Sequence, residues 1–268
     1  MADYILAVDV GNSRIKCGLF DHSQTAPGSG DLPHCLRAAS SPVKEILPWD
    51  EMSSWALSLV PGSVASIAAG ANPAGVHRLL ASWRHADWPE PHVIDNAASL
   101  PLRTGVEAVE KVGIDRLLNA VAANVIRAAD RPAIIVDSGT ATTVDFVSAA
   151  GEFLGGAILP GFELAARSLH QYTALLPLIE IDELANASRE PLGRDTRGAL
   201  CSGLFWGQLG AVNELVSRLG RLSDQPAMLI LTGGGASLLS TQMPHARWEP
   251  HLSLQGLILA ADSLPGSA

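Results

Sequence analysis

The most informative hydrophobic pattern is a pair of similar apolar runs, each of strand length and each ending in Asp-x-Gly. Residues 5–13 read Ile-Leu-Ala-Val-Asp-Val-Gly-Asn-Ser, and residues 134–141 read Ile-Ile-Val-Asp-Ser-Gly-Thr-Ala. The copies lie 128 positions apart, close to half of the 268 residues. A second strand-like stretch follows each copy, at 15–20 and at 142–147. The pattern predicts two β-hairpins that head two related domains.

Three further periodic segments surround the hairpins. Apolar residues at helical spacing over 114–126, followed by the breaker Pro132, predict an amphipathic helix. Residues 228–231 predict a strand that runs into the turn Gly233-Gly234-Gly235, where glycine permits a close approach to a ligand. Residues 199–216 predict a second helix. Three glycines inside it cost roughly 1 kcal/mol each against alanine, and close packing on another helix, such as one of a second subunit, would offset that cost.

Breaks in the hydrophobic pattern predict a loop and a boundary between two domains. The stretch 24–48 is rich in Pro, Ser and Gly and predicts a loop or irregular excursion. Pro101 and Gly105 interrupt the pattern near the middle, so we place a boundary there, with an N-terminal domain over 1–105 and a C-terminal domain over 106–268. The hydrophobic content of 47% can fill the cores of two such α/β domains.

Composition excludes several classes of protein. Three widely spaced cysteines, none in a CxxC pair, indicate neither a disulfide framework nor a zinc site. Residues 1–4 do not start a signal peptide, and no apolar run reaches the roughly 18 to 20 residues of a membrane span, so we expect a cytoplasmic protein without a membrane partner. A net charge of -9 disfavours nucleic acid as a partner. It leaves open an anionic small molecule, because phosphate binding depends on the local field.

Paired Asp-x-Gly hairpins provide what a phosphate clamp needs. Glycine lets backbone amides turn toward an anion, and a carboxylate can hold a hydrated Mg²⁺ beside it. A single copy, Asp9 to Ser13, would be explained by an ordinary hairpin turn. The second copy and the Gly233-Gly234-Gly235 turn favour the phosphate interpretation.

Two charged residues have both a structural and a functional interpretation. Lys16 lies on the returning strand, where it could aim its ammonium at the phosphate loop or simply face solvent. Asp115 begins the helix after Gly113. It could be an acidic cap stabilised by the helix dipole, or a base that accepts a proton from a substrate hydroxyl during attack on phosphorus.

Three ordered segments, at 9–16, 112–116 and 137–143, resemble the motifs of type III pantothenate kinases. They read Asp-Val-Gly-Asn-Ser-x-Ile-Lys, Val-Gly-Ile-Asp-Arg and Asp-Ser-Gly-Thr-Ala-x-Thr. Shorter matches follow in the family order at 155–161, 173–177, 193–196 and 233–235. The resemblance implies an α/β fold of two actin-like, ribonuclease H-like domains with a nucleotide cleft between them. It also implies transfer of the ATP γ-phosphate to pantothenate, the first step of coenzyme A biosynthesis, in a homodimer whose interface lies in the second domain.

The resemblance also implies roles for single residues. Asp115 would be the catalytic base, and Asp9 and Asp137 would hold metal ions, namely Mg²⁺ and a monovalent cation such as K⁺ or NH₄⁺. Pantothenate would contact Gly113, Ile114, Asp115, Arg116 and Thr196. ATP would contact Asp9, Val10, Gly11, Asn12, Ser13, Arg14, Ile15, Lys16, Gly139, Thr140 and Gly234.

This sequence departs from the family pattern in two places that concern the substrate. The stretch 102–106 lacks the aromatic residue that often precedes the Gly-x-Asp-Arg motif, and 65–73 lacks the usual Val-Val-Pro-like ending. Two alternatives stay open: another small-molecule, sugar-type kinase of the actin-like superfamily, or a non-catalytic accessory factor on the same scaffold. The joint presence of Asp9, Lys16, Asp115 and Asp137 argues against a catalytically dead scaffold.

Overall fold

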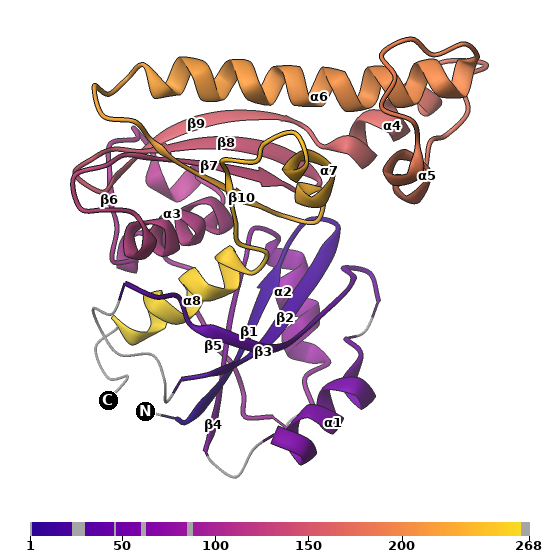
Figure 1. Cartoon of the computed structure of the whole chain (residues 1–268). Helices are drawn as coiled ribbons and strands as arrows, with labels where there is room; N and C mark the ends of the chain where they lie inside the picture. The colour runs from indigo at the N-terminus through magenta and orange to yellow at the C-terminus, as the bar shows by residue number, and fades with distance from the viewer. Residues whose placement is uncertain (1, 23–29, 46, 60–62, 85–87, 264–268) are drawn as a thin grey trace. The chain divides into compact units, whose positions relative to one another are not determined.

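The computed structural model of the chain divides into two compact units (Figure 1). It describes residues 2–22, 30–45, 47–59, 63–84 and 88–263. Unit 1 comprises Met1–Ala128, Gly151–Phe153 and His251–Ala268, and unit 2 comprises Ala129–Ala150 and Leu154–Pro250. Unit 2 is therefore inserted, along the chain, between stretches that together build unit 1.

Unit 1 contains a five-stranded sheet in the order β3-β2-β1-β4-β5. The strands β1 and β2 are antiparallel, as are β2 and β3, whereas β4 runs parallel to β1 and β5 parallel to β4. Their bounds are β1 Tyr4–Val10, β2 Arg14–Asp21, β3 His34–Pro42, β4 Val64–Gly70 and β5 His92–Val93. The helical segments are α1 Trp49–Leu59, α2 Pro73–Ala81, α3 Ile114–Ile126, α8 Leu252–Asp262 and the 3₁₀ turns Ala97–Ser99 and Val109–Lys111. A short strand, β6 Arg103–Thr104, pairs with Glu152 and Phe153.

The alternation along β1 sends its side chains to two different environments. Leu6, Val8 and Val10 belong to a buried cluster that includes tryptophans of the α1 and α2 region. Asp9 lies on the opposite face, where α8 covers the sheet and contacts α3. Gly256 makes that helix pair close, since a Cβ built there would lie 1.9 Å from the Leu118 carbonyl oxygen.

Unit 2 repeats the strand order of unit 1. Its strands lie in the order β11-β10-β7-β8-β9, with β7 and β8 antiparallel and β10 and β11 parallel to β7. The sheet continues to β6, which pairs with the first two residues of β9, and these residues group with unit 1. The bounds are β7 Ala133–Ser138, β8 Ala141–Val147, β9 Glu152–Pro160, β10 Met228–Thr232 and β11 Arg247–Trp248. Its helices are α4 Phe162–Gln171, α5 Ile181–Asn186, α6 Thr196–Gly220 and α7 Ala236–Ser240. The long helix α6 runs along one face of this sheet (Figure 1).

The predicted elements are mostly confirmed. Both hairpins form, the first predicted helix has the bounds of α3, and the second lies within α6. The loop predicted over 24–48 is wrong for 34–42, which form β3; residues 23–29 lie outside the described residues. Because β3 is an edge strand with much of its length exposed, its sequence lacks the apolar alternation of a buried strand.

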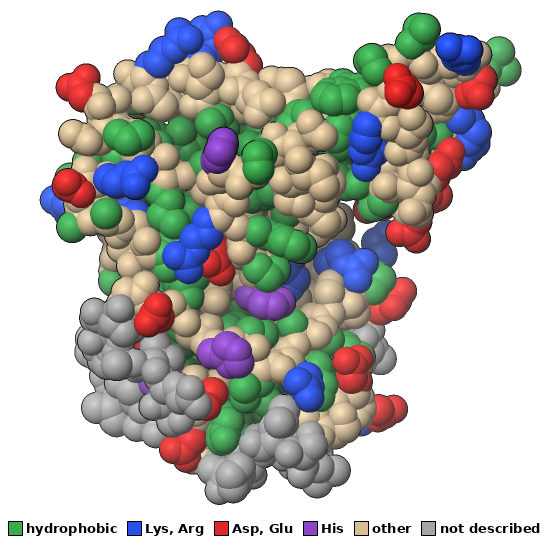
Figure 2. All heavy atoms as spheres, in the orientation of Figure 1, with side chains coloured by type: hydrophobic (Ala, Val, Ile, Leu, Met, Phe, Trp, Pro, Cys, Tyr) green, Lys and Arg blue, Asp and Glu red, His purple; other side chains and the backbone are tan. Residues whose placement is uncertain are grey.

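The contact grouping also differs from the boundary drawn at residue 105. Helices α3 and α8 both group with unit 1, because they pack on each other and on β4. Among the described residues, no helix combines the length and the apolar character needed to cross a bilayer. On the face shown in Figure 2, Lys and Arg side chains of the described residues are interspersed with Asp and Glu and do not gather into one basic patch.

Candidate active site

The first hairpin exposes its tip and buries its flanks. Asn12 and Ser13 are exposed, and the turn is closed by a hydrogen bond from the Gly11 amide to the Arg14 carbonyl at 2.9 Å. Val10 and Ile15 are buried in the apolar cluster, so only their backbone groups could meet a ligand. The Arg14 guanidinium donates to the hydroxyl of Ser40 on β3 at 2.7 Å.

Two of the predicted site residues meet across this hairpin. Asp9 and Lys16 are direct partners in the antiparallel register of β1 and β2, so their side chains share a face of the sheet. Asp9 is only 4% exposed. Its Oδ2 accepts a hydrogen bond from the hydroxyl of Ser253 at 2.8 Å. Ser253 is the second residue of α8, and sequence reasoning missed it, because nothing local connects residues 244 positions apart.

Asp115 lies in the first turn of α3, as predicted. Its Oδ1 accepts a hydrogen bond from the backbone amide of Arg116 at 2.9 Å. Gly113 precedes the helix, and a Cβ built there would lie 2.6 Å from Asp115 Oδ1 and 4.0 Å from the Cβ of Ala71. Ala71 directly follows β4, which is parallel to β1. Asp115 and Asp9 are therefore both positioned at the carboxyl edge of the unit 1 sheet.

An aromatic ring does lie near the Gly-x-Asp-Arg motif, although not in the stretch where the family pattern has one. The guanidinium carbon of Arg116 lies 5.6 Å from the ring centroid of Phe153. Phe153 is fully buried and pairs with Thr104 of β6. The ring therefore orients Arg116 by a cation–π contact and cannot itself be an exposed wall of a substrate pocket.

The second hairpin is held by backbone groups of two glycine turns. The carbonyl of Thr140 accepts from the amide of Gly161 at 3.0 Å, and the carbonyl of Ser138 accepts from the amide of Gly235 at 2.8 Å. A Cβ at Gly161 would lie 2.1 Å from the Gly139 carbonyl oxygen, which leaves no room for any other residue there. These contacts leave Gly139, Thr140 and Gly234 exposed.

Asp137 lies at the end of β7, opposite Thr143 and Thr232 of the two neighbouring strands. Gly233, at φ +90°, brings its backbone so close that a Cβ would lie 2.4 Å from Asp137 Oδ1. Carboxylate, hydroxyl and carbonyl oxygens are suitable ligands for a hard cation. The described residues contain no cluster of three or more His, Cys, Asp or Glu that could hold a metal.

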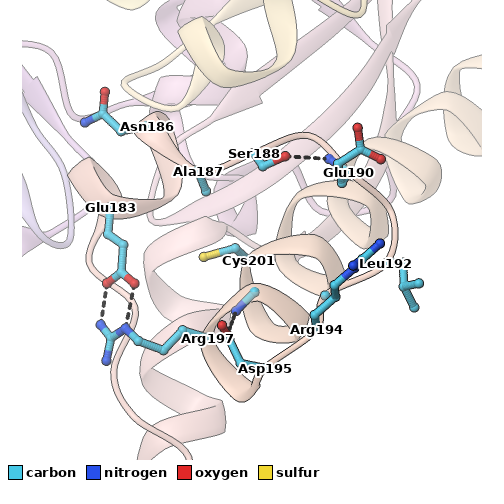
Figure 3. Close-up of a pocket in the computed structure, with 12 residues that line it drawn as sticks. Glu183, Asn186, Ala187, Ser188, Glu190, Leu192, Arg194, Asp195, Arg197 and Cys201 are labelled. Atoms are coloured by element: carbon cyan, nitrogen blue, oxygen red, sulfur yellow. Dashed lines mark hydrogen bonds and ion pairs between the residues drawn. The ribbon is translucent and has the colours of Figure 1, made fainter.

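Thr196 begins α6 and is exposed. The preceding residue, Asp195, caps the helix by accepting from the Gly198 amide at 2.7 Å. Beside this helix start lies a pocket of about 550 Å³, lined by residues of α5, of the loop between α5 and α6, and of the first two turns of α6. Figure 3 shows the ion pair of Arg197 with Glu183 across it, with the sulfur of Cys201 on its wall. The Arg197 guanidinium lowers the pKa of the Glu183 carboxyl.

Comparison with known proteins is consistent with this geometry. The sequence profile of the family described as type III pantothenate kinase matches residues 5–218. Curated proteins of that name include one from Paramagnetospirillum magneticum, 34% identical, with 95% of both chains covered. Another, from Gluconobacter oxydans, is 33% identical, with 98% of this chain and 94% of the relative covered.

Solved structures share the fold at low identity. One is a candidate Baf family transcriptional activator from Campylobacter jejuni, with a TM-score of 0.58, 17% identity, and 96% and 97% of the two chains covered. Another is the activator of 2-hydroxyisocaproyl-CoA dehydratase from Clostridium difficile with bound ADPNP, with a TM-score of 0.51, 12% identity, and 97% and 95% covered. The fold is thus the two-unit α/β fold of actin-like ATPases and sugar kinases, as predicted.

Proposed function

The chain belongs to the type III pantothenate kinase family, and from this membership we propose which of its residues carry out the reaction. The protein is an ATP-dependent kinase that phosphorylates pantothenate for coenzyme A biosynthesis. The observation that carries the residue assignment is the position of Asp115. It begins a helix at the same sheet edge at which Asp9 and Lys16 face each other.

Asp115 is the base for the primary hydroxyl of pantothenate. The hydroxyl oxygen attacks the γ-phosphorus of ATP, its bond to phosphorus forms as the bond to the bridging β,γ-oxygen breaks, and Asp115 receives the proton. The positive end of the α3 dipole favours a negative charge at this place, and the Arg116 amide orients the carboxylate. Because phosphoryl transfer is largely dissociative, orienting the hydroxyl counts as much as removing its proton.

The first hairpin binds the phosphates of ATP. The exposed tip at Asn12 and Ser13 offers backbone amides and short polar side chains, and Lys16 offers a cation on the returning strand. Val10 and Ile15 contribute through the backbone, because the apolar core holds their side chains. Asp9 would hold Mg²⁺, which neutralises charge on the transferred phosphoryl group.

The second hairpin supplies the remaining ATP contacts through Gly139, Thr140 and Gly234, which are exposed where the glycine turns meet it. Asp137, with the threonine strands on either side, would hold a monovalent cation such as K⁺. A nucleotide site between the two domains stays a prediction from the sequence, as does the cytoplasmic location.

Pantothenate is contacted by Gly113 to Arg116 and by Thr196. A homodimer through the second domain is supported by the surface of unit 2. Ile158, Tyr172 and Leu175, on β9 and after α4, are exposed to 64%, 80% and 91%. On α6, Gly203, Gly207 and Gly210 form an exposed stripe, and beyond the adjacent residues and backbone of α6 itself no described atom lies within 4 Å of a Cβ built on them. Close approach of a second helix would account for glycine at these places.

Steady-state kinetics with pantothenate, ATP, Mg²⁺ and K⁺ tests the assignment. Asp115→Asn keeps the size and part of the hydrogen bonding but removes the base, so kcat should fall by roughly 10² to 10⁴ with ATP affinity nearly unchanged. Asp50→Asn is the matched control, since Asp50 is an exposed acid in the first turn of α1 and should leave turnover unchanged.

Near-wild-type turnover of a folded Asp115→Asn protein would make Asp115 only a helix cap and overturn its assignment. Phosphorylation of a sugar with no phosphorylation of pantothenate would instead favour the sugar-kinase alternative.

A further inference from the structure

Helix α8 brings a side chain from the far end of the chain to the phosphate hairpin. The matched family segment ends at residue 218, well before α8 at Leu252–Asp262. Ser253 lies in the first turn of that helix, is 5% exposed, and donates its hydroxyl to Asp9 Oδ2 at 2.8 Å. We propose that Ser253 is a positioning residue for the kinase reaction, which fixes the Asp9 carboxylate for binding of the Mg²⁺–ATP complex.

The chemistry of the contact favours this role. A carboxylate that is 4% exposed must replace lost hydration by hydrogen bonds, and a bond to a charged acceptor is shorter and stronger than a neutral one. Ser253 is also the second residue of its helix, where the helix dipole favours a neighbouring negative charge. The hydroxyl and the helix end therefore stabilise the same charged form in one orientation.

Ser253 can hold the Asp9 carboxylate in one position because α8 is itself fixed within unit 1. Gly256 packs on the Leu118 backbone of α3. The side-chain Nε2 of Gln255 donates to the Pro33 carbonyl at 3.1 Å, and His22 Nε2 lies 3.0 Å from the carboxylate of Asp262 at the other end of the helix. The helix is thus anchored along its length, and displacement of the Ser253 hydroxyl would require displacement of these contacts as well.

The inference rests on the proposed role of Asp9 at the phosphates. The first measurement is calorimetric affinity for ATP with Mg²⁺, without pantothenate, on the full chain. Ser253→Ala should weaken it about tenfold, the scale of one hydrogen bond to a charged group. In kinetics, the KM for ATP should rise while the KM for pantothenate stays unchanged.

Two control variants sharpen the test. Ser253→Thr keeps a hydroxyl and should recover most of the affinity for ATP. Ser263→Ala, which removes an exposed hydroxyl that donates to the Leu259 carbonyl at the end of α8, should have no effect.

A double-mutant cycle separates this role from a general structural one. If Ser253 acts through Asp9, Ser253→Ala should cause no further loss of affinity in an Asp9→Asn background. An equal loss in both backgrounds, or wild-type affinity in the folded Ser253→Ala protein, would overturn the proposal. If Asp9→Asn itself leaves the affinity unchanged, the assignment of Asp9 under the proposed function fails instead. A thermal melt of each variant confirms that the affinity belongs to folded protein.

Discussion

The two hairpins come from equivalent places in the two sheets, but different contacts hold their tips and aspartates. The tip at Gly11 to Ser13 is closed by one bond within the turn and receives one more backbone bond, from the Val43 amide to the Ser13 carbonyl at 2.8 Å. Its aspartate is held by a side chain, the Ser253 hydroxyl. The tip at Gly139 and Thr140 is held by close contacts and hydrogen bonds with the backbones of Gly161, Gly233 and Gly235.

The comparison shows that two copies of one sequence motif can tolerate amino-acid substitutions to different degrees. Where side chains fix a hairpin, a substitution removes one contact and the loss is graded. Where backbones touch backbones, any side chain added at a glycine collides with atoms that cannot turn aside. The duplicated Asp-x-Gly shows that the hairpins are related. It does not reveal this difference, because the residues that contact each hairpin lie elsewhere in the chain.

The largest expected effect comes from adding one methyl group at Gly161. Its Cβ would lie 2.1 Å from the Gly139 carbonyl oxygen, so Gly161→Ala should lower the free energy of unfolding by about 3 kcal/mol or more. In the first hairpin, a Cβ at Gly11 would lie 3.1 Å from the Arg14 carbonyl oxygen, and Gly11→Ala should stay within about 1 kcal/mol of wild type. Denaturant melts measure both, and similar losses in the two variants would remove the distinction.

A smaller effect is expected from Asp137→Ala, which should weaken ATP use without unfolding the protein. Losing a carboxylate ligand worth about 1.4 kcal/mol corresponds to about tenfold weaker cation binding, so half-maximal activity should need about tenfold more K⁺. Asp130→Ala removes an exposed acid just before β7 and serves as the control. Parallel losses of thermal stability and activity, with an unchanged K⁺ requirement, would mean that Asp137 only supports the hairpin.

Replacement of the two serines beside the hairpins by alanine should change the free energy of unfolding in different directions. The Ser138 hydroxyl is fully buried, and it has no hydrogen-bond partner among the described residues. Ser138→Ala removes that buried polar group, so the free energy of unfolding should be unchanged or higher by up to about 1 kcal/mol. Ser253→Ala should lower it by about as much. A clear destabilisation by Ser138→Ala would indicate a bound water that satisfies the hydroxyl.

A further effect, absent at neutral pH, concerns Cys17 on the returning strand of the first hairpin. Burial raises the pKa of its thiol to about 12, and burial likewise raises the pKa of Cys35 to about 11. Both should be alkylated slowly by iodoacetamide at pH 8. Above pH 9 the unfolded thiol ionises while the folded Cys17 does not, so the free energy of unfolding should fall from pH 9 to 12. Cys17→Ala should reduce that slope, and rapid alkylation of native Cys17 at pH 8 would contradict its burial.

Local patterns were sufficient to predict the elements that repeat or alternate strongly. The hairpins and α3 follow from apolar runs and a following breaker, and the candidate residues Asp9, Lys16 and Asp115 were located with them. The sheet register then places Asp9 opposite Lys16, as an antiparallel hairpin requires. The edge strand β3 was missed because its exposed side chains leave no periodic signal.

The contacts that hold the site could not be predicted, because they join distant parts of the chain. Ser253 is an ordinary serine near a helix start until the fold brings α8 against β1. Gly161 was one glycine among 25, and only the backbone oxygen of Gly139 beside it shows why it must be glycine. Phe153 is the second residue of β9, and the fold brings its ring to 5.6 Å from the guanidinium carbon of Arg116.

The order in which the chain is made gives the insertion of unit 2 a further meaning. A ribosome completes all of unit 2 before it begins α8, which is the last helix of unit 1. Strands β1 to β4 are therefore synthesised before unit 2, yet one face of their sheet lacks α8 until that helix emerges. Domains usually fold as units during synthesis, N-terminal first. Here unit 1 begins before unit 2 and is completed after it, so a chain interrupted before α8 contains the residues of the second hairpin but lacks the serine that holds the aspartate of the first.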